Sequence, residues 1–356
     1  MEEKKMETIV ILGGGYSGVK TAKNILERTK NNNNIKVILI DRKDFQCLLP
    51  SLPSAISNNR EKIIINFKDT FGKYKNFEFI KGEIESIDFK DQKVILSNGK
   101  TVYYNHLVIA FGAQPTDFGV EGVRQHAIMF WNEEDLKEYI TKLNKFITQG
   151  KSPKIIIVGA GAVGVEVASE TSHFLRKNKI TPDILIIEAK DRCLPTLPEK
   201  LSKPIEKYLL KNQIKLIYNS PVIKVDEKKV YSKTGEEFEY DILLWCSGVI
   251  ANSIIKSIES KSGFTFEKGP QGRIIVDEYL RVKNLQNVWA VGDIAYPENQ
   301  KVVPIPLAQF AVQMADTLSK NIINTINKKE LKKVSLKFKG IVITLSKFSA
   351  GALITK

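Results

Sequence analysis

The sequence predicts an α/β protein, because one strand–turn–helix pattern built around glycine occurs twice. The glycines have the spacing GxGxxG at residues 13–18 and again at residues 159–164. Each copy follows an apolar run typical of a buried strand, at residues 8–12 and 154–158, and opens a stretch compatible with a helix. A glycine pattern in this context is typical of a dinucleotide-binding unit. We therefore expect two Rossmann-like units in the chain.

Each glycine of the pattern has a physical role. The first permits a tight turn, the second lets backbone N–H groups approach a pyrophosphate, and the third lets the helix pack on the strand. The N-terminus of the helix adds a positive dipole that favours phosphates. The residues expected to hold the two pyrophosphates are Gly13, Gly14, Gly15, Tyr16, Ser17 and Gly18 in the first copy and Gly159, Gly161 and Gly164 in the second.

A second apolar run after each glycine pattern ends in an acid, at Asp41 and at Glu188. The spacing is close to the roughly twenty residues usual for such units, where the carboxylate accepts a hydrogen bond from a ribose 2′-hydroxyl. The same carboxylate would repel a 2′-phosphate, which favours NADH over NADPH at the second site. Lys190 and Arg192 follow closely, so the use of NADPH stays open.

Three further apolar runs end in residues suited to a nucleotide site, namely Gly112, Gly248 and Asp293. A glycine directly after a buried strand would let the chain leave the sheet beside a bound nucleotide. An aspartate in the same place can accept hydrogen bonds from flavin hydroxyls, although aspartates also occur at ordinary turns and helix caps.

Composition sets further bounds. A chain of 356 residues exceeds a single core and fits two nucleotide domains with a short tail. The three cysteines, Cys47, Cys193 and Cys246, form no CxxC pair, so we expect neither a disulfide framework nor a metal site. The charged start has no apolar core of a signal peptide, and no apolar run reaches the roughly 18 residues of a spanning helix. These features predict a reducing, cytoplasmic location.

The net charge of +14 favours anionic partners, and lysines are frequent from Lys320 onward. An anionic membrane surface is one such partner. The alternative is a lysine-rich composition that only keeps the protein soluble. Nucleic acid is not expected, because no motif of interleaved aromatic and basic residues accompanies the charge.

Together these features resemble the two-dinucleotide-binding-domain flavoproteins, and among them the type II NADH dehydrogenases, which are single-chain NADH:quinone oxidoreductases. The resemblance extends from about Thr8 to Ile354. The segments that carry it are residues 118–122 with His126 and Ala127, residues 164–168, residues 245–249, and the AQxxxQ pattern from Ala308 to Gln313.

The resemblance implies a domain order in which an NADH-binding domain is inserted into an FAD-binding domain. The expected bounds are 1–120 and 256–325 for the FAD-binding domain, 121–255 for the NADH-binding domain, and 326–356 for a short C-terminal segment. Family members usually continue into amphipathic helices that dock on a membrane. Peripheral attachment to the cytoplasmic face of the membrane is therefore an open expectation for this chain, and its apolar residues near 341–345 are expected to form strands.

The resemblance also implies which residues bind the nucleotides. FAD, held tightly and without a covalent bond, would rest on the first glycine pattern with Asp41 and Arg42 at the adenosine ribose. Its other expected contacts are Gln46, Ile84, Gly112 and Asp293, with Ala308 and Gln309 at the ring. NADH would rest on the second glycine pattern and Glu188, with Gly248 near its nicotinamide half.

Three residues are implied to be catalytic. Glu166 matches a glutamate to which the family assigns a catalytic or nicotinamide-side role, although an acid in a helix's first turn is also favoured by the dipole. Gln309, beside a helix N-terminus, is suited to stabilise negative charge on the reduced flavin. Gln313 lies one turn later on the same face and could line a quinone site, or it could be an interhelical or surface glutamine.

Several alternatives stay open. A sulfide:quinone oxidoreductase needs paired cysteines at the flavin, and no cysteine follows Cys246. A single-cysteine disulfide or peroxide reductase would use Cys47. A flavoprotein that responds to NADH and acts by binding a partner, as in the apoptosis-inducing-factor group, would share both domains. The quinone, a soluble acceptor in its place, and a homodimer are likewise left open by the sequence.

Overall fold

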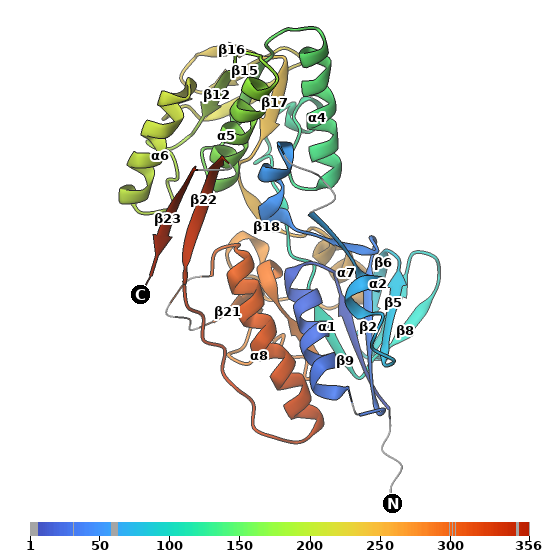
Figure 1. Ribbon diagram of the computed structural model, residues 1–356. Helices are drawn as coiled ribbons and strands as arrows, with labels where there is room; N and C mark the ends of the chain where they lie inside the picture. The colour runs from blue at the N-terminus through green and yellow to red at the C-terminus, as the bar shows by residue number, and fades with distance from the viewer. Residues whose placement is uncertain are drawn as a thin grey trace, which may run out of the picture. The chain divides into compact units, whose positions relative to one another are not determined.

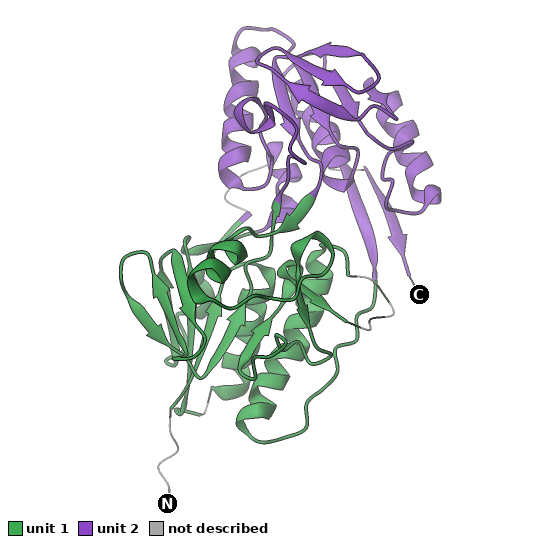
Figure 2. Cartoon of the chain, turned by 180° about the vertical axis from the view of Figure 1, so that it is seen from behind, with its two compact units in different colours: residues 1–47, 64–114, 249–338 green, residues 48–63, 115–248, 339–356 purple. Residues whose placement is uncertain are grey.

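The chain forms two compact units in the computed structural model (Figures 1 and 2). The structure describes residues 6–30, 32–57, 63–298, 300, 302, 304–346 and 349–355. Unit 1 comprises residues 1–47, 64–114 and 249–338, and unit 2 comprises residues 48–63, 115–248 and 339–356. Each unit contains one of the two glycine patterns.

Unit 1 is built on a five-stranded sheet in the order β20-β9-β1-β2-β5. Its strands are β1 (Glu7–Leu12), β2 (Ile35–Asp41), β5 (Phe77–Lys81), β9 (His106–Ile109) and β20 (Val288–Ala290). All neighbours in this sheet pair in parallel. The central strands read as continuous apolar runs because helices or loops cover both faces of a parallel sheet. The first glycine pattern follows β1, at the centre of the sheet.

Two helices of unit 1 pack side by side, α1 (Tyr16–Thr29) and α8 (Ala308–Ile326) (Figure 1). Asn24 lies in their interface, where its amide donates to the carboxylate of Asp316 (2.8 Å) and to the hydroxyl of Ser319 (3.3 Å). These contacts join α1, which follows the first glycine loop, to α8, which carries the AQxxxQ pattern.

Smaller elements complete unit 1. They are β3 (Phe45–Cys47) paired with β4 (Ile64–Asn66), helix α2 (Phe67–Phe71), the antiparallel sheet β6 (Ile84–Asp88), β7 (Lys93–Leu96) and β8 (Thr101–Tyr103), β10 (Ala113–Pro115) paired with β18 (Val249–Ala251), helix α7 (Ile254–Ser262), and β19 (Ile274–Val276) paired with β21 (Ala295–Pro297). Helix α7 packs on β6.

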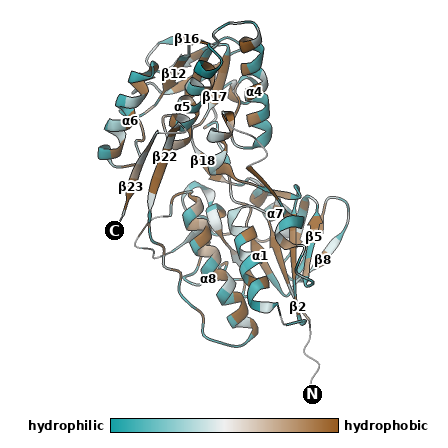
Figure 3. Cartoon of the chain, in the orientation of Figure 1, coloured by the Kyte–Doolittle hydropathy of each residue, from teal (hydrophilic) through white to brown (hydrophobic). Residues whose placement is uncertain are grey.

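Unit 2 repeats the parallel architecture with four strands in the order β13-β12-β11-β17. The strands are β11 (Lys154–Val158), β12 (Asp183–Ile187), β13 (Ile214–Ile217) and β17 (Ile242–Trp245). The other elements are α3 (Val123–His126), α4 (Glu133–Thr148), α5 (Ala162–Lys177), α6 (Glu199–Lys211) and the antiparallel strands β14 (Val222–Val225), β15 (Lys229–Ser232) and β16 (Glu237–Glu239). In Figure 3, hydrophobic colour concentrates on the sheet strands, whereas α4 and α6 show mixed faces.

Two segments distant in the sequence join unit 2 by packing on its helices. Residues 49–51 and 53–56 form two short 3₁₀ turns, the second of which packs on α5, and Ser57 donates to the carboxylate of Glu170 (2.6 Å). The C-terminal hairpin of β22 (Gly340–Ser346) and β23 (Ser349–Ile354) packs on α5 and α6, with Ile343 and Leu345 buried. The strands expected near residues 341–345 are therefore present.

The unit bounds differ from the domain bounds expected from the sequence. The chain enters unit 2 at Pro115 rather than after residue 120, and leaves it at Gly248 rather than after residue 255. Residues 48–63 and 339–356 also belong to unit 2. These two segments belong to unit 2 because they bury apolar side chains against helices that are distant from them in the sequence. In the described part of the chain, no helix is both long and apolar enough to cross a bilayer.

Candidate functional site

Of the three glycines that define the GxGxxG pattern of the first loop, two are fixed by packing and one faces open space. Gly13 has φ +109°, and a Cβ there would lie 2.5 Å from the carbonyl oxygen of Ala110. A Cβ on Gly18 would lie 1.8 Å from the carbonyl oxygen of Gly13, so the helix could not start this close to the strand with any other residue. No heavy atom lies within 4 Å of a Cβ built on Gly15. Open space at this glycine is what a closely approaching phosphate requires.

The second glycine loop repeats this geometry in unit 2. Gly159 has φ +104° and lies against the carbonyl of Cys246, 3.0 Å from its would-be Cβ. A Cβ on Gly164 would lie 2.0 Å from the carbonyl oxygen of Gly159. Gly161 again has nothing within 4 Å. The two loops thus impose the same constraints at the same three positions.

Both helices that follow the loops begin without a side-chain cap. The N-cap of α1 is Gly15 and that of α5 is Gly161, and neither helix has an acid in its first turn. By contrast, Asn132 and Asp135 form a complete capping box at the start of α4. Uncapped N–H groups and an unopposed helix dipole fit a bound phosphate. The residues present therefore fit the pyrophosphates of two dinucleotides.

The two predicted acids hold the glycine loops by accepting hydrogen bonds from backbone N–H groups. Asp41 accepts from the N–H of Gly14 (2.6 Å) and from the N–H two residues further along the chain (2.9 Å). Glu188 accepts from the N–H of Ala160 (2.7 Å) and again from the N–H two residues on (2.9 Å). Each carboxylate retains acceptor capacity for a hydroxyl. The loop-fixing role was not predicted from the sequence.

The two residues that precede Asp293 and follow β20 contact the first turn of α1. Ser17 donates to the carbonyl of Val291 (3.2 Å), and a Cβ on Gly292, which has φ +82°, would lie 2.5 Å from the Ser17 hydroxyl. Burial raises the pKa of Asp293 to about 6, and the nearby Arg273 opposes that rise.

Arg273 is a buried cation that sequence reasoning missed. Its guanidinium donates to the carbonyls of Ala295 (2.6 Å) and Pro304, which lie on either side of the segment leading to α8. Its Nε is buried and has no hydrogen-bond partner among the described residues. Desolvation lowers the pKa of this arginine, and Asp293 acts against that effect. Arg273 therefore connects Asp293, the aspartate predicted to bind the flavin, with the segment that precedes α8.

Helix α8, which begins at Ala308 and Gln309, has no side-chain cap at its N-terminus and no acid in its first turn. The amide of Gln313 donates to the carbonyls of Gln309 (3.1 Å) and Lys337 (2.9 Å) and accepts from the N–H of Lys337 (2.9 Å). These contacts tie α8 to the chain that follows it.

The remaining residues expected at FAD lie in unit 1. Gln46 is buried in β3, Ile84 begins β6, and Gly112 has φ +66° with open space where a Cβ would lie. Arg42 is exposed and lies 3.9 Å from the carboxylate of Glu83. All residues expected at FAD fall in unit 1, and all those expected at NADH fall in unit 2.

Glu166 lies one turn inside α5, so the first-turn explanation for this acid does not apply. Its carboxylate accepts from the backbone N–H of Thr344 in the C-terminal hairpin (2.8 Å). Burial, with a smaller effect from the neighbouring Glu170, raises its pKa to about 7. A carboxyl group that titrates near neutral pH can hold or release a proton under working conditions.

The cysteines of unit 2 are poor nucleophiles. Burial raises the pKa of Cys246 to about 12 and that of Cys193 to about 11. Both therefore remain thiols near neutral pH, and a thiol is much less reactive than a thiolate. Cys47 lies on β3 in unit 1. Among the described residues, no cluster of three or more His, Cys, Asp or Glu is arranged to hold a metal ion.

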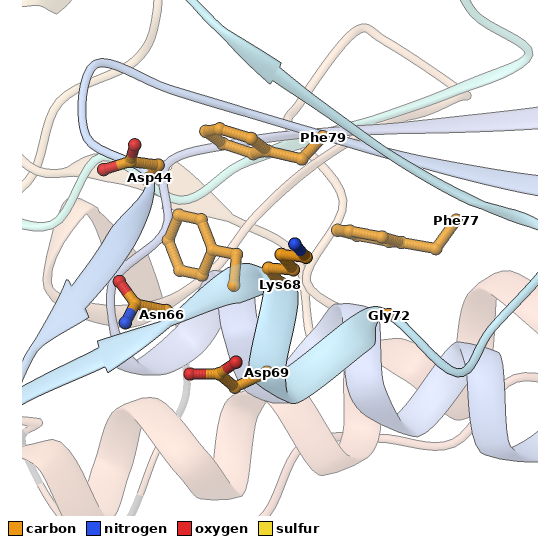
Figure 4. Close-up of a pocket in the computed structure, with 8 residues that line it drawn as sticks. Asp44, Asn66, Lys68, Asp69, Gly72, Phe77 and Phe79 are labelled. Carbon is orange, nitrogen blue, oxygen red and sulfur yellow. The ribbon is translucent and has the colours of Figure 1, made fainter.

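A hollow of about 440 Å³ opens in unit 1 near the start of α2 (Figure 4). Its lining residues are Asp44, Asn66, Phe67, Lys68, Asp69, Gly72, Phe77 and Phe79. The rings of Phe67 and Phe79 pack with centroids 5.1 Å apart, and Phe67 also supports Gly14 of the first loop. None of the residues predicted to bind a nucleotide lines this hollow. Its wall includes Phe67, which packs behind the first glycine loop.

Residues 7–315 match the family model of the pyridine nucleotide-disulphide oxidoreductases. The chain therefore belongs to this family of two-domain nucleotide-binding proteins. The match covers both glycine loops, both acids and Asp293.

Within the family, the chain is similar to type II NADH dehydrogenases, as the sequence predicted. It is 27% identical to a type II NADH:quinone oxidoreductase of Haemophilus influenzae, covering 99% of this chain and 88% of that protein. NDH2 from Plasmodium falciparum in complex with NADH matches with a TM-score of 0.84 at 20% identity, covering 98% and 90% of the two chains. A sulfide:quinone oxidoreductase from Aquifex aeolicus matches with a TM-score of 0.81 at 22% identity, covering 98% and 83%. The predicted fold is thus confirmed.

The two kinds of loop glycine should respond differently to alanine. We expect Gly164→Ala to lower the free energy of unfolding by about 3 kcal/mol or more, because its Cβ meets a backbone carbonyl that cannot move. Gly161→Ala should cost about 1 kcal/mol or less, since the position is open and only the helix cap changes. Its Cβ should instead weaken binding of a dinucleotide. Thermal melts and calorimetric titration with NAD⁺ would measure both effects, and equal melting temperatures would contradict the assignment.

The raised pKa of Glu166 predicts a pH-dependent stability. As pH rises from the ordinary carboxyl range towards 7, the unfolded chain loses its proton before the folded chain does, so stability falls. Glu166→Gln removes this cost and keeps an acceptor for Thr344. The variant should therefore melt above the wild type at about pH 8.5, with the difference shrinking towards about pH 5. The same change at the exposed Glu138 is the control. A difference independent of pH would refute the prediction.

Proposed function

We propose that this chain is an FAD-dependent NADH:quinone oxidoreductase that does not pump protons. The observation that carries the proposal is the repetition of one phosphate-binding geometry in two units of a single chain. Two dinucleotides held by one protein are suited to exchange electrons with each other. The similarity to type II NADH:quinone oxidoreductases over 99% of the chain supports quinone as the acceptor.

The residues of unit 1 are proposed to bind FAD. The first loop and the N-terminus of α1 would hold the pyrophosphate, Asp41 the adenosine ribose, and Asp293 the hydroxyls of the ribityl chain. Gln309 and the uncapped N-terminus of α8 would present dipoles to the ring, and Gln313 would keep α8 joined to residue 337. When bound, FAD accepts a hydride from NADH and passes the electrons to quinone.

The residues of unit 2 are proposed to bind NADH and to handle a proton. The second loop would hold the pyrophosphate and Glu188 the adenosine ribose. Reduction of a quinone to a quinol consumes one proton beyond the hydride that NADH supplies. The carboxyl of Glu166, with its pKa of about 7, is suited to hold that proton near neutral pH.

The surroundings of Glu188 favour NADH over NADPH. Of the two nearby cations that could bind a 2′-phosphate, Arg192 donates instead to backbone carbonyls of its own loop, including Leu194 (3.0 Å) and Leu197 (2.8 Å), whereas Lys190 has an exposed side chain. The guanidinium of Arg192 therefore stabilises the loop. The carboxylate of Glu188, which is buried, would accept a hydrogen bond from the ribose 2′-hydroxyl of NADH and repel a 2′-phosphate.

We further propose that the protein acts at the cytoplasmic face of a membrane. Support comes from exposed lysines in the segment that leads from α8 to the C-terminal hairpin: Lys328, Lys329, Lys332, Lys333, Lys337 and Lys339. Each lysine near an anionic surface can contribute about 1 kcal/mol to binding. The homodimer stays a prediction.

The visible spectrum of the purified protein tests the reaction. We expect flavin absorption bands that bleach when NADH is added without oxygen and return when menadione or a ubiquinone analogue follows. Sulfide in place of NADH should leave the bands unchanged, because the raised pKa values of Cys193 and Cys246 keep both as thiols. A folded protein that stays colourless after incubation with FAD would overturn the proposal. Bleaching without return would favour the partner-binding alternative.

Replacement of Cys47 tests the thiol alternative. Cys47→Ser should leave NADH:quinone turnover within about two-fold of the wild type, because hydride and electron transfer through a flavin needs no thiol. Steady-state rates with menadione would measure this, and Cys193→Ser provides a matched control in unit 2. A loss of turnover only in the Cys47 variant would instead support a single-cysteine reductase.

A further inference from the structure

A short loop where the chain enters unit 2 holds an aromatic residue in a strained conformation. Phe118 has φ +54°, a region that bulky side chains rarely adopt. Its N–H donates to the hydroxyl of Thr116 (3.1 Å), and the N–H of Gly119 donates to Asp117 (2.9 Å). Asp117 in turn pairs with Arg124. The loop is thus fixed by its own contacts in a conformation that costs free energy at Phe118.

The strain at Phe118 is not explained by burial of its ring. The residue is 64% exposed, so the strained backbone conformation does not serve to bury the ring in the hydrophobic core. Its ring instead lies against Gly248: a Cβ built there would fall 2.1 Å from Cζ of Phe118. The indole of Trp245, at the end of β17, donates to the carbonyl of Thr116 (2.9 Å). The loop is therefore attached to the carboxyl end of β17, and its aromatic ring stands exposed beside that end.

The strand order indicates what would reach this ring. Glu188 follows β12, the second glycine loop follows β11, and Gly248 follows β17, and these three strands are neighbours in the order β12-β11-β17. The loops after β11 and β17 touch, since a Cβ on Gly159 would lie 3.0 Å from Cβ of Ser247. A dinucleotide with its adenosine at Glu188 and its pyrophosphate on the glycine loop continues across the end of β17. Its nicotinamide half then arrives beside Gly248 and Phe118.

We propose that Phe118 is a binding residue for the nicotinamide half of NADH, whose pyridine ring it contacts with its own ring. This inference rests on the proposed NADH site of unit 2. Offset or edge contacts between aromatic rings are favourable, and a ring held in place before binding loses little freedom when the ligand arrives. The strain at Phe118 then has a function, because it keeps the ring at the end of the nucleotide site.

The test compares two ligands that differ only at the nicotinamide. NAD⁺ carries it, whereas ADP-ribose does not, and both should bind through the glycine loop and Glu188. Phe118→Gly removes the ring, and glycine adopts the observed φ without strain, so the loop should be kept. Phe118→Tyr keeps a ring. Binding is measured by calorimetry on the FAD-loaded protein, with KM for NADH and the melting temperature alongside.

We expect Phe118→Gly to bind NAD⁺ about ten-fold more weakly and to bind ADP-ribose as the wild type does, with a melting temperature that is not lowered. Phe118→Tyr should bind both ligands as the wild type does, and KM for NADH should follow NAD⁺ affinity. The control is Ile223→Ala, which removes another exposed apolar side chain of unit 2 and should change neither affinity.

Two outcomes would overturn the inference. Unchanged NAD⁺ affinity in Phe118→Gly would show that the ring does not meet the nicotinamide. An equal loss for NAD⁺ and ADP-ribose would show that the ring only supports the loop. Failure of the proposed function has a different result, namely a wild-type flavin that NADH does not reduce. The ratio of the two affinities still decides the role of Phe118 in that case.

Discussion

The contact between the last and first glycines of each loop is the constraint on which both units depend. The would-be Cβ of Gly18 lies 1.8 Å from the carbonyl oxygen of Gly13, and that of Gly164 lies 2.0 Å from the carbonyl oxygen of Gly159. Only a residue without a side chain lets the helix start this close to the strand. The same closeness points the uncapped helix N-terminus at the open middle of the loop. Packing and anion binding are thus satisfied by one arrangement.

The repetition of this arrangement explains why one chain suits electron exchange between two nucleotides. In each unit an acid that ends or directly follows the second strand accepts a hydrogen bond from one backbone N–H of the glycine loop, that of Gly14 or of Ala160, so the loop is held in place before a ligand arrives. Binding then loses little conformational freedom. The units differ in what they add: unit 1 has Asp293 and the N-terminus of α8, whereas unit 2 has a carboxyl group with a pKa near 7. The proposed activity uses both additions.

Local features could be predicted from the sequence, and long-range contacts could not. The glycine loops, their acids and the strand-end residues depend on spacing within a few tens of residues, which sequence periodicity reveals. Other contacts join segments that only the fold brings close together. They are the hydrogen bond from Arg273 to the carbonyl of Pro304, the contact of Phe118 with Gly248, and the hydrogen bond from the N–H of Thr344 to Glu166. Residues 48–63 and 339–356 were assigned to other domains for the same reason. The helical position of Gln313 follows from the sequence pattern, whereas the hydrogen bond from its amide to the carbonyl of Lys337 could not be predicted.

The C-terminal hairpin has a consequence for the order of biosynthesis. The chain passes from one unit to the other after residues 47, 63, 114, 248 and 338, so neither unit is a continuous stretch of sequence. Ile343 and Leu345 of the hairpin are buried, and the hairpin packs on α5 and α6. During translation the sheet of unit 2 emerges complete at residue 245, yet these helices lack their cover until residues 340–354 leave the ribosome. The faces of α5 and α6 that the hairpin covers therefore stay exposed until the last part of unit 1 has been synthesised.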